Sequence, residues 1–185
     1  MFFRRSEVEQ LPMRLSLKLS CNWTLWYTNA SAKTTETFEQ CLIPLGSVST
    51  AEAFWALYSH CIRPSNLPKG TEYHLFREGI RPMWEDEANA NGSTLLLRLK
   101  RGYIDYCWEA LLLALIGGQL GPEANGAVAG RRFTDDHLSL WSSKFHADQH
   151  QQISANVCRL LGLKEDSPSE YKSHAGTLER TTVIP

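Results

Sequence analysis

The chain lacks a long hydrophobic run, a strong net charge and any cysteine spacing typical of a metal site. Its longest apolar run, Ala110–Ile116, is too short to cross a bilayer, and residues 1–12 lack the apolar core of a secretory signal peptide. A formal net charge of -1 disfavours a broad contact with duplex DNA or with an anionic membrane. We therefore expect a cytoplasmic or nuclear protein that binds neither membranes nor DNA.

The five cysteines, at positions 21, 41, 61, 107 and 158, lie inside apolar patterns and never in a C-x-x-C pair. That distribution favours reduced thiols over a zinc site or a disulfide framework, and no motif requires a cofactor. With 185 residues and 43% apolar content, the chain can bury the core of one domain. We place this domain at residues 14–176, between flexible segments at residues 1–13 and 177–185.

Tryptophan, by contrast, is abundant, and some of the six tryptophans stand where a core would not place them. In residues 14–27 the apolar side chains alternate as in a strand, with Trp23 on the apolar face and Trp26 on the polar face. Trp141 alternates with the leucines before it and again falls on the polar side. A large ring on a solvated face exposes costly apolar area unless a loop or a ligand covers it.

Helical periodicity predicts a first helix over about residues 50–62. It begins with Ser49 and Glu52 at capping-box spacing, and its buried stripe comprises Phe54, Leu57, Tyr58, Cys61 and Ile62. Trp55 lies outside this stripe, so it is either half covered by a neighbouring helix or an anchor for a partner protein.

Two further helices are expected. One spans residues 104–116 and ends at Gly117, with a core stripe of Ile104, Trp108, Leu111 and Leu115. The other begins near Asp148, with Gln151 at the capping position, ends at Gly162 and buries Ile153, Val157, Leu160 and Leu161. Trp55 and the Glu109 to Leu113 side of the second helix could form a groove for an amphipathic helix.

The remaining periodic segments favour strands. They cover residues 37–43, 72–76, 94–100, 126–133 and 137–141, and the last two are joined by a hairpin turn at 134–136. Because strands outnumber helices and hairpins link some of them, we predict an α+β fold with a mostly antiparallel sheet and three helices on one face. The other face would then be free to bind a ligand.

A loop at residues 81–92 carries Trp84 beside Glu85. An aromatic ring can stack on a planar heterocycle while a neighbouring carboxylate accepts hydrogen bonds from its edge, and guanine offers two adjacent donors for this. Arg131 and Arg132 would meet an attached phosphate chain. Each residue also has an ordinary structural explanation: a ring that covers the core edge, an acidic turn in water, or arginines on a solvated strand end.

Several stretches taken together resemble the translation initiation factor 4E family of messenger-RNA cap-binding proteins, most closely its class II branch. They are WTLWYTN (23–29), AFWALYSH (53–60), HLFREGIRPMWEDEANANG (74–92), CWEALLLALIGGQL (107–120), GAVAGRRF with SLW (126–141) and EYKSH (170–174). The resemblance implies a cupped hand, with a curved antiparallel sheet, three helices on its convex back and a 7-methylguanosine cap in the concave slot.

The resemblance also assigns roles to individual residues. It implies that Phe38 and Trp84 stack on the two faces of the methylated base and that Glu85 holds the guanine edge. Trp141 matches the ring against the N7-methyl group, and Arg132 matches a phosphate-binding arginine.

This chain departs from the family pattern at the same slot. Phe38 stands where the family usually has tryptophan, and a smaller ring should stack more weakly. Thr134 and His137 occupy positions of further phosphate-contacting lysines, so the resemblance implies a depleted phosphate clamp. Trp23 is a class I trait, which leaves the branch open.

For the convex back, the resemblance implies a partner-binding surface. Trp55 matches the family's partner-anchoring tryptophan, with Ala51 on the same ridge, and Leu113 matches one of its apolar neighbours. The acidic residue expected at position 110 is Ala110, with Glu109 one position earlier. The implied partner is a helical peptide motif of an initiation scaffold or of a repressor.

Three functions remain open at this point. The first is a monomeric cap-binding regulator of translation, and the second is an interaction protein that acts mainly through Trp55 and binds little cap. The third is a cap hydrolase that holds magnesium with Glu85, Asp86, Glu87 and His74. Because the chain shows no nucleophile-activating set and no metal-ligand spacing, we do not expect an enzyme.

Overall fold

The computed structural model describes residues 16–29, 37–165 and 167–175. The terminal segments expected at residues 1–13 and 177–185 lie outside these ranges. Within them, no helix is long and apolar enough to cross a membrane.

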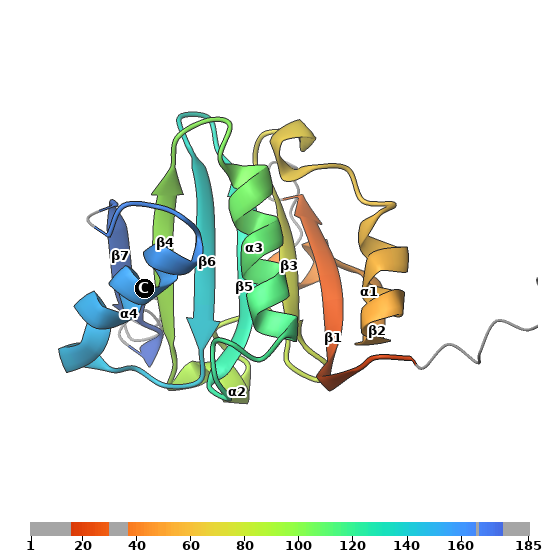
Figure 1. The fold of residues 1–185 in the computed structure, drawn as a ribbon, viewed down its shortest axis with the longest axis horizontal. Coiled ribbons are helices and arrows are strands. Elements are labelled where there is room, and N and C mark those ends of the chain that lie inside the picture. The colour runs from red at the N-terminus through yellow and green to blue at the C-terminus, as the bar shows by residue number, and fades with distance from the viewer. Residues whose placement is uncertain (1–15, 30–36, 166, 176–185) are drawn as a thin grey trace, which may run out of the picture.

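Seven strands form one curved sheet in the order β2-β1-β3-β5-β6-β4-β7, and every neighbouring pair is antiparallel. The strands are β1 (Lys18–Asn29), β2 (Leu42–Thr50), β3 (Thr71–Arg77), β4 (Ser93–Leu99), β5 (Ala124–Arg131), β6 (Asp136–Ser142) and β7 (Ser169–Ser173). Figure 1 shows the strands side by side behind the helices.

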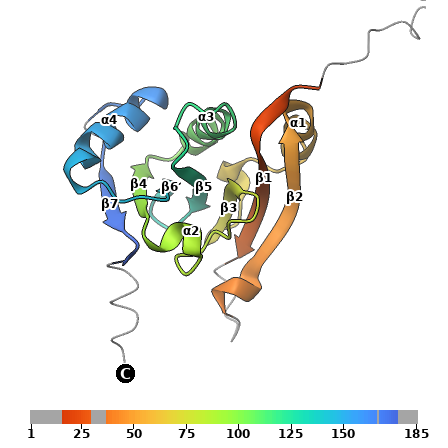
Figure 2. The ribbon, with the colours of Figure 1, turned by 90° about the horizontal axis from the view of Figure 1, so that it is seen from below.

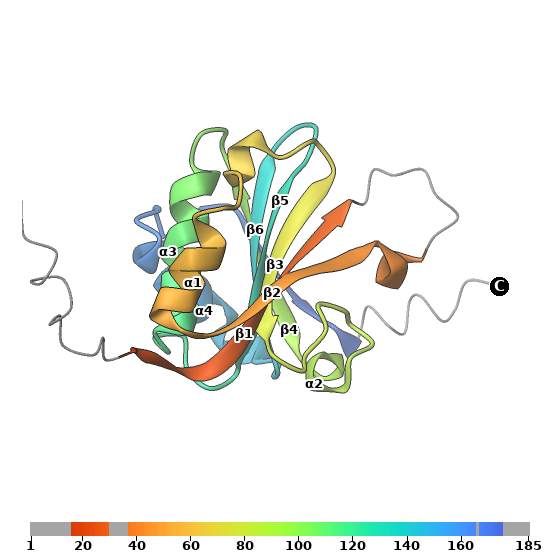
Figure 3. The same cartoon turned by 90° about the vertical axis from the view of Figure 1, so that its right-hand side faces the viewer.

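Three helices cover the convex face of the sheet, which we call the helical face. They are α1 (Ala51–Tyr58), α3 (Ile104–Ile116) and α4 (His150–Leu160). Figures 2 and 3 show a fourth, short helix, α2 (Glu87–Ala90), on the other side, which we call the open face. The predicted α+β class and the placement of the three helices are confirmed, and α2 is an addition within a segment that was expected to be a loop.

The core lies between the sheet and these three helices. Every second residue of the central strands points into it, as the pleat requires: Trp23, Leu25, Tyr73, Leu75, Leu95, Leu97, Ala127, Ala129 and Leu138 are buried there. The predicted stripe of α3 is buried as well, since Ile104, Trp108, Leu111 and Leu115 are each at most 3% exposed. Burial on this scale explains why α3 has the predicted bounds.

The prediction for α1 is correct for its start but wrong for the residue that caps it and for its C-terminal end. Thr50, not Ser49, caps the helix, because its hydroxyl accepts a hydrogen bond from the Ala53 amide at 3.1 Å. Glu52 instead accepts the Leu17 amide at 3.2 Å, which fixes the chain that enters β1. The helix stops at Tyr58, so Ile62 lies beyond it and is 54% exposed.

Two other elements differ from expectation. Residues predicted as a strand over 37–43 begin with a 3-10 turn, η1 (Phe38–Cys41), and β2 starts only at Leu42. A capping box between Thr37 and Gln40 closes this turn and competes locally with the extended conformation. The edge strand β7 was not predicted. Two more 3-10 turns are η2 (Pro64–Asn66) and η3 (Ala147–Gln149), and η3 delays the start of α4 to His150.

Candidate functional site

Two glycines of β5 shape the floor of the open face. In the register, Gly126 lies between Phe76 and Trp141, and Gly130 lies between Glu72 and His137. A Cβ atom at either glycine would collide with the facing ring, that of Phe76 or of His137. Because the glycines leave this room, side chains from β3 and β6 meet across the strand between them.

Trp141 lies on the open face, as its alternation predicts, but other side chains cover most of it. It is 8% exposed and forms a small cluster with Phe76, Val128 and Ile80. The Phe76 ring meets it edge-on at 5.4 Å between centroids, and the His174 ring lies 4.6 Å away. Only a narrow part of Trp141 is therefore open to a ligand.

His174 is a contact that the sequence did not single out. Its Nδ1 lies 2.7 Å from the Asn89 carbonyl, and its Nε2 lies 2.6 Å from the Thr94 hydroxyl. Burial lowers the pKa of His174, and the Asn89 hydrogen bond only partly opposes this effect. The ring therefore links the chain just after β7 to α2 and β4, and it also contacts Trp141.

Trp84 sits on a loop that internal hydrogen bonds hold in shape. The buried amide of Asn89 donates to the carbonyl oxygens of Arg81 and Met83, each at 2.9 Å. Asp86 accepts the Arg81 amide at 2.9 Å and the Ala88 amide at 3.0 Å, and the second bond caps α2. The loop thus presents the Trp84 ring, 41% exposed, on a preorganised support.

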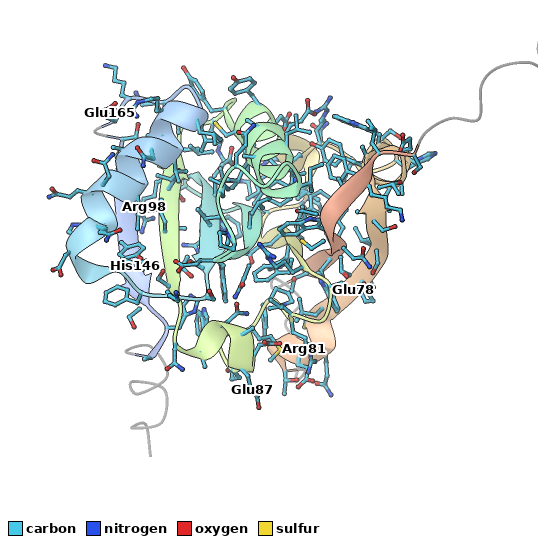
Figure 4. All side chains as sticks on the ribbon, turned by 60° about the horizontal axis from the view of Figure 1, so that its bottom comes forward. Glu78, Arg81, Glu87, Arg98, His146 and Glu165 are labelled. Atoms are coloured by element: carbon cyan, nitrogen blue, oxygen red, sulfur yellow. The ribbon has the colours of Figure 1, made fainter. Side chains whose placement is uncertain are left out.

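Phe38 approaches the same region from the other side. It begins η1, is 43% exposed, and its ring stands edge-on to buried His74 at 6.3 Å. The neighbouring Glu39 forms an ion pair with Arg81, the residue that opens the Trp84 loop. Figure 4 shows Arg81 between the α2 loop and the chain that leads into β2. The two segments that carry exposed rings are therefore linked directly.

Glu85 follows Trp84 at the tip of this loop and is exposed. It makes no hydrogen bond or ion pair with any residue that the structure describes. An exposed carboxylate that has no protein partner and follows an exposed indole in sequence can accept two donors from the edge of a stacked base.

The four residues of the hydrolase alternative do not form a metal site. Asp86 is engaged in capping α2, and the His74 Nε2 lies 2.5 Å from the Thr28 hydroxyl on β1. Across residues 16–29, 37–165 and 167–175, no group of three His, Cys, Asp or Glu side chains is arranged to hold a metal ion.

Arg131, the last residue of β5, and Arg132, which follows it, have different environments. Arg131 donates to the Leu67 carbonyl at 3.0 Å and is thereby held to the loop before β3. This contact does not support the expectation that Arg131 meets a phosphate chain. Arg132 is exposed beyond the strand, on the open-face side of the alternation. Thr134 is exposed in the same turn, where its hydroxyl donates to Asp135 at 3.1 Å.

His137 is turned away from the solvent and towards an acid. Its Nε2 lies 3.1 Å from a Glu72 carboxylate oxygen, and the His74 Nε2 lies 3.8 Å from the other oxygen. Burial lowers the pKa of His74 to about 4, more than the nearby carboxylate of Glu72 raises it. Burial acts to raise the pKa of Glu72, but the His137 hydrogen bond and the charges of His74, His137 and Arg132 hold it below its ordinary value.

On the helical face, Trp55 stands at the edge of the core. It is 44% exposed and meets Phe54 and Tyr58 edge-on. A hollow of about 240 Å³ beside it is lined by Trp55, Tyr58, Ser59, Cys61, Ile62, Arg63 and Glu109. The structure therefore brings Trp55 and Glu109 together, with Glu109 accepting a hydrogen bond from Arg63 at 2.7 Å.

The other two residues predicted for a partner surface do not line this hollow. Leu113 is 40% exposed one turn further along α3, and Ala51 is half-buried one turn before Trp55 on α1. Their predicted role in partner binding stays a prediction.

Comparisons with known proteins agree on one family. Residues 18–183 match the model of the family "Eukaryotic initiation factor 4E". "Eukaryotic translation initiation factor NCBP" of Triticum aestivum is 39% identical over 160 residues, which cover 83% of this chain and 68% of the relative.

Two solved structures share the fold. Ascaris suum eIF4E-3 in complex with the m2,2,7G cap is 34% identical with a TM-score of 0.79, covering 86% of this chain and 92% of its own. C. elegans eIF4E-3 in complex with the 4E-binding protein Mextli and a cap analog is 30% identical with a TM-score of 0.80, and the match covers 92% of this chain and 97% of that one.

Proposed function

The chain belongs to the eukaryotic initiation factor 4E family, and from that premise we propose that it binds the 7-methylguanosine cap of messenger RNA and acts in translation initiation. The observation that carries the proposal is the pair of exposed rings, Phe38 and Trp84, on two segments joined by the Glu39–Arg81 ion pair, with Glu85 beside the second ring. The proposed site of action is the cytoplasm.

The surroundings of each residue suit its proposed role in the complex. Phe38 and Trp84 stack on opposite faces of the base, and a methylated guanine gains cation-π attraction because the methyl group fixes a positive charge on it. Glu85 accepts the N1 and exocyclic amine donors in bidentate fashion. Trp141, held by Phe76 and His174, offers its remaining edge to the N7-methyl group.

The solved relatives support this assignment. The Ascaris suum protein has been solved with both the m7G cap and the m2,2,7G cap, and this chain is 34% identical to it in each case. The support concerns the class of ligand. The residue roles come from the family resemblance, and the exposure of Phe38 and Trp84 and the Glu39–Arg81 ion pair are consistent with them.

The proposal is tested by titrating the full chain with 7-methyl-GTP and with GTP and following tryptophan fluorescence. We expect 7-methyl-GTP to bind at least about tenfold more tightly, since only the charged base profits fully from the two rings. Equal affinity for the two nucleotides, or no binding of either, would contradict cap recognition.

A second proposed function concerns the helical face. Trp55 is half exposed and lines a hollow, and we propose that it contacts one turn of a helical peptide from a scaffold or a repressor. The solved complex of the Caenorhabditis elegans relative with Mextli supports the class of partner. A protein that acts mainly through this face would bind the peptide and yet be washed from a cap resin, so the two assays together separate this alternative from cap binding.

A further inference from the structure

We infer that Glu72, fixed by His137 across Gly130, sets the preference of the slot for the phosphate chain of its ligand, so that affinity gains little from each phosphate beyond the first. This inference rests on the proposed cap binding and concerns the other end of the same ligand. It assigns a role in specificity to two residues on the floor of the open face.

The contact between Glu72 and His137 depends on a gap in the strand between them. Glu72 lies on β3 and His137 on β6, with Gly130 of β5 opposite both. The His137 ring and the Glu72 side chain occupy the space where a Cβ at position 130 would stand. His137 is consequently 4% exposed, so its ring is not presented to a ligand at the surface.

The Glu72 carboxylate is the source of negative charge in this cluster. The pKa of Glu72 lies below its ordinary value, so the carboxylate is ionised at neutral pH, and the pKa of His74 near 4 leaves that ring uncharged. The Glu72 side chain retains 23% exposure and acts electrostatically on Arg132. A negative charge therefore lies within electrostatic range of Arg132, the arginine proposed to meet the phosphates.

Three cations on or near β4 and β7 are paired with acids. Arg98, opposite His137 on β4, contacts Asp135 at 3.1 Å and Glu170 at 2.7 Å. Arg101 contacts Asp136 at 2.6 Å, and Lys172 contacts Glu170 at 2.5 Å. Within the described residues, Arg132 forms none of the ion pairs that occupy these neighbours.

The consequence for a ligand follows from Coulomb's law. Each phosphate added to a nucleotide brings negative charge that Arg132 attracts and Glu72 repels, so Glu72 offsets part of the attraction of Arg132. The base stacks independently of this balance. The slot should therefore bind 7-methylguanosine mono-, di- and triphosphate with similar strength.

The test measures the affinity of the full chain for these three nucleotides at fixed ionic strength. For the wild type we expect the triphosphate to bind less than about tenfold more tightly than the monophosphate. For Glu72→Gln we expect this ratio to rise by about fivefold to tenfold, because one repulsive charge is removed. The ratio compares ligands that share the same base, so a general loss of stability would not raise it.

Glu78→Gln is the matched control, since it removes the same charge just beyond β3, where Glu78 accepts a hydrogen bond from Asn22 at 2.7 Å. Its ratio should stay within about twofold of the wild type. A rise of less than about threefold in Glu72→Gln, or an equal rise in Glu78→Gln, overturns the inference while cap binding stands.

The wild type provides one test that does not need Glu72→Gln to fold. A wild-type ratio of about tenfold or more overturns the inference. Failure of all three nucleotides to bind would overturn the proposed function and this inference with it, so the two kinds of failure are distinguishable.

Discussion

The two faces of the sheet use the same strands in different ways. On the helical face, stability is spread over many buried apolar side chains from β1, β3, β4, β5, β6 and three helices. On the open face, a few side chains reach across two glycines, and the small apolar cluster of Phe76, Val128 and Trp141 is the second core of the described residues. Function on the open face therefore depends on single contacts.

This difference separates residues that are proposed to bind the ligand from residues that support them. Phe38, Trp84 and Glu85 are exposed, and their replacement should change ligand binding with little effect on folding. His74 and Trp141 are buried below them, and their replacement should affect both. The same division holds on the helical face between exposed Trp55 and the buried Trp108. The predictions below test it.

The largest expected effect is at Glu85. Glu85→Ala leaves the N1 and amine donors of the stacked base without an acceptor, which should weaken 7-methyl-GTP binding by about 2 to 4 kcal/mol. The melting temperature should hardly change, because Glu85 has no partner among the described residues. Titration calorimetry gives the affinity, and Glu87→Ala, two positions on, is the control. If Glu85→Ala binds like the wild type, Glu85 does not read the guanine edge.

The next largest effect is expected on the helical face, at Trp55. Trp55→Ala should weaken capture of a 4E-binding helical peptide by about 2 kcal/mol or more, the size of a hot-spot truncation, and leave 7-methyl-GTP affinity intact. Peptide binding measured by fluorescence anisotropy tests this. Tyr106→Ala, which removes a ring that is 65% exposed on α3 but does not line the hollow, should bind the peptide normally. Joint loss of stability and cap binding in Trp55→Ala would show that Trp55 is structural.

The buried His74 on the floor of the open face should make the free energy of unfolding decrease as the pH falls. A histidine whose pKa is depressed by folding contributes stability above its unfolded pKa, and this is lost as the pH falls towards the folded value, here about 4. His74 should therefore account for a loss of about 2 kcal/mol between pH 7 and pH 5, if its unfolded pKa is about 6.5. The ionised Glu72 adds a loss in the same direction at lower pH.

Urea unfolding at pH 7 and pH 5 measures this dependence. His74→Gln, which cannot be protonated in this range, should lose less stability on acidification than the wild type. His60→Gln replaces an exposed histidine and should behave like the wild type. An unchanged acid dependence in His74→Gln would mean that His74 is not the group that resists protonation.

Much of the helical face could be predicted from the sequence, because periodicity over many buried residues is a redundant signal. The bounds of α3 and its stripe agree with the structure, whereas α1 was extended to Ile62 because Cys61 and Ile62 continue the apolar spacing beyond the real end at Tyr58. The edge strand β7 escaped prediction because its side chains are exposed or half-buried and carry no alternation.

The open face was predictable only in part. Alternation placed Trp141 on it, but the contact between Glu72 and His137 joins strands that are not neighbours, through a glycine whose effect appears only in the register. Phe38 came from the family resemblance alone. Its surroundings were predicted as a strand, and the capping box of Thr37 and Gln40 that forms η1 was overlooked.

Phe38 is also where the smallest effect is expected. An indole has a larger and more electron-rich face than a benzene ring, so Phe38→Trp should strengthen binding of 7-methyl-GTP by about 0.5 to 1.5 kcal/mol. GTP should gain much less, because only the methylated base carries a fixed positive charge, and the ratio of the two affinities should rise. Phe145→Trp adds the same fluorophore outside the slot, where Phe145 stacks on Tyr171 at 5.3 Å, and corrects the fluorescence titration. Equal gains for both nucleotides would mean that another residue stacks on the base.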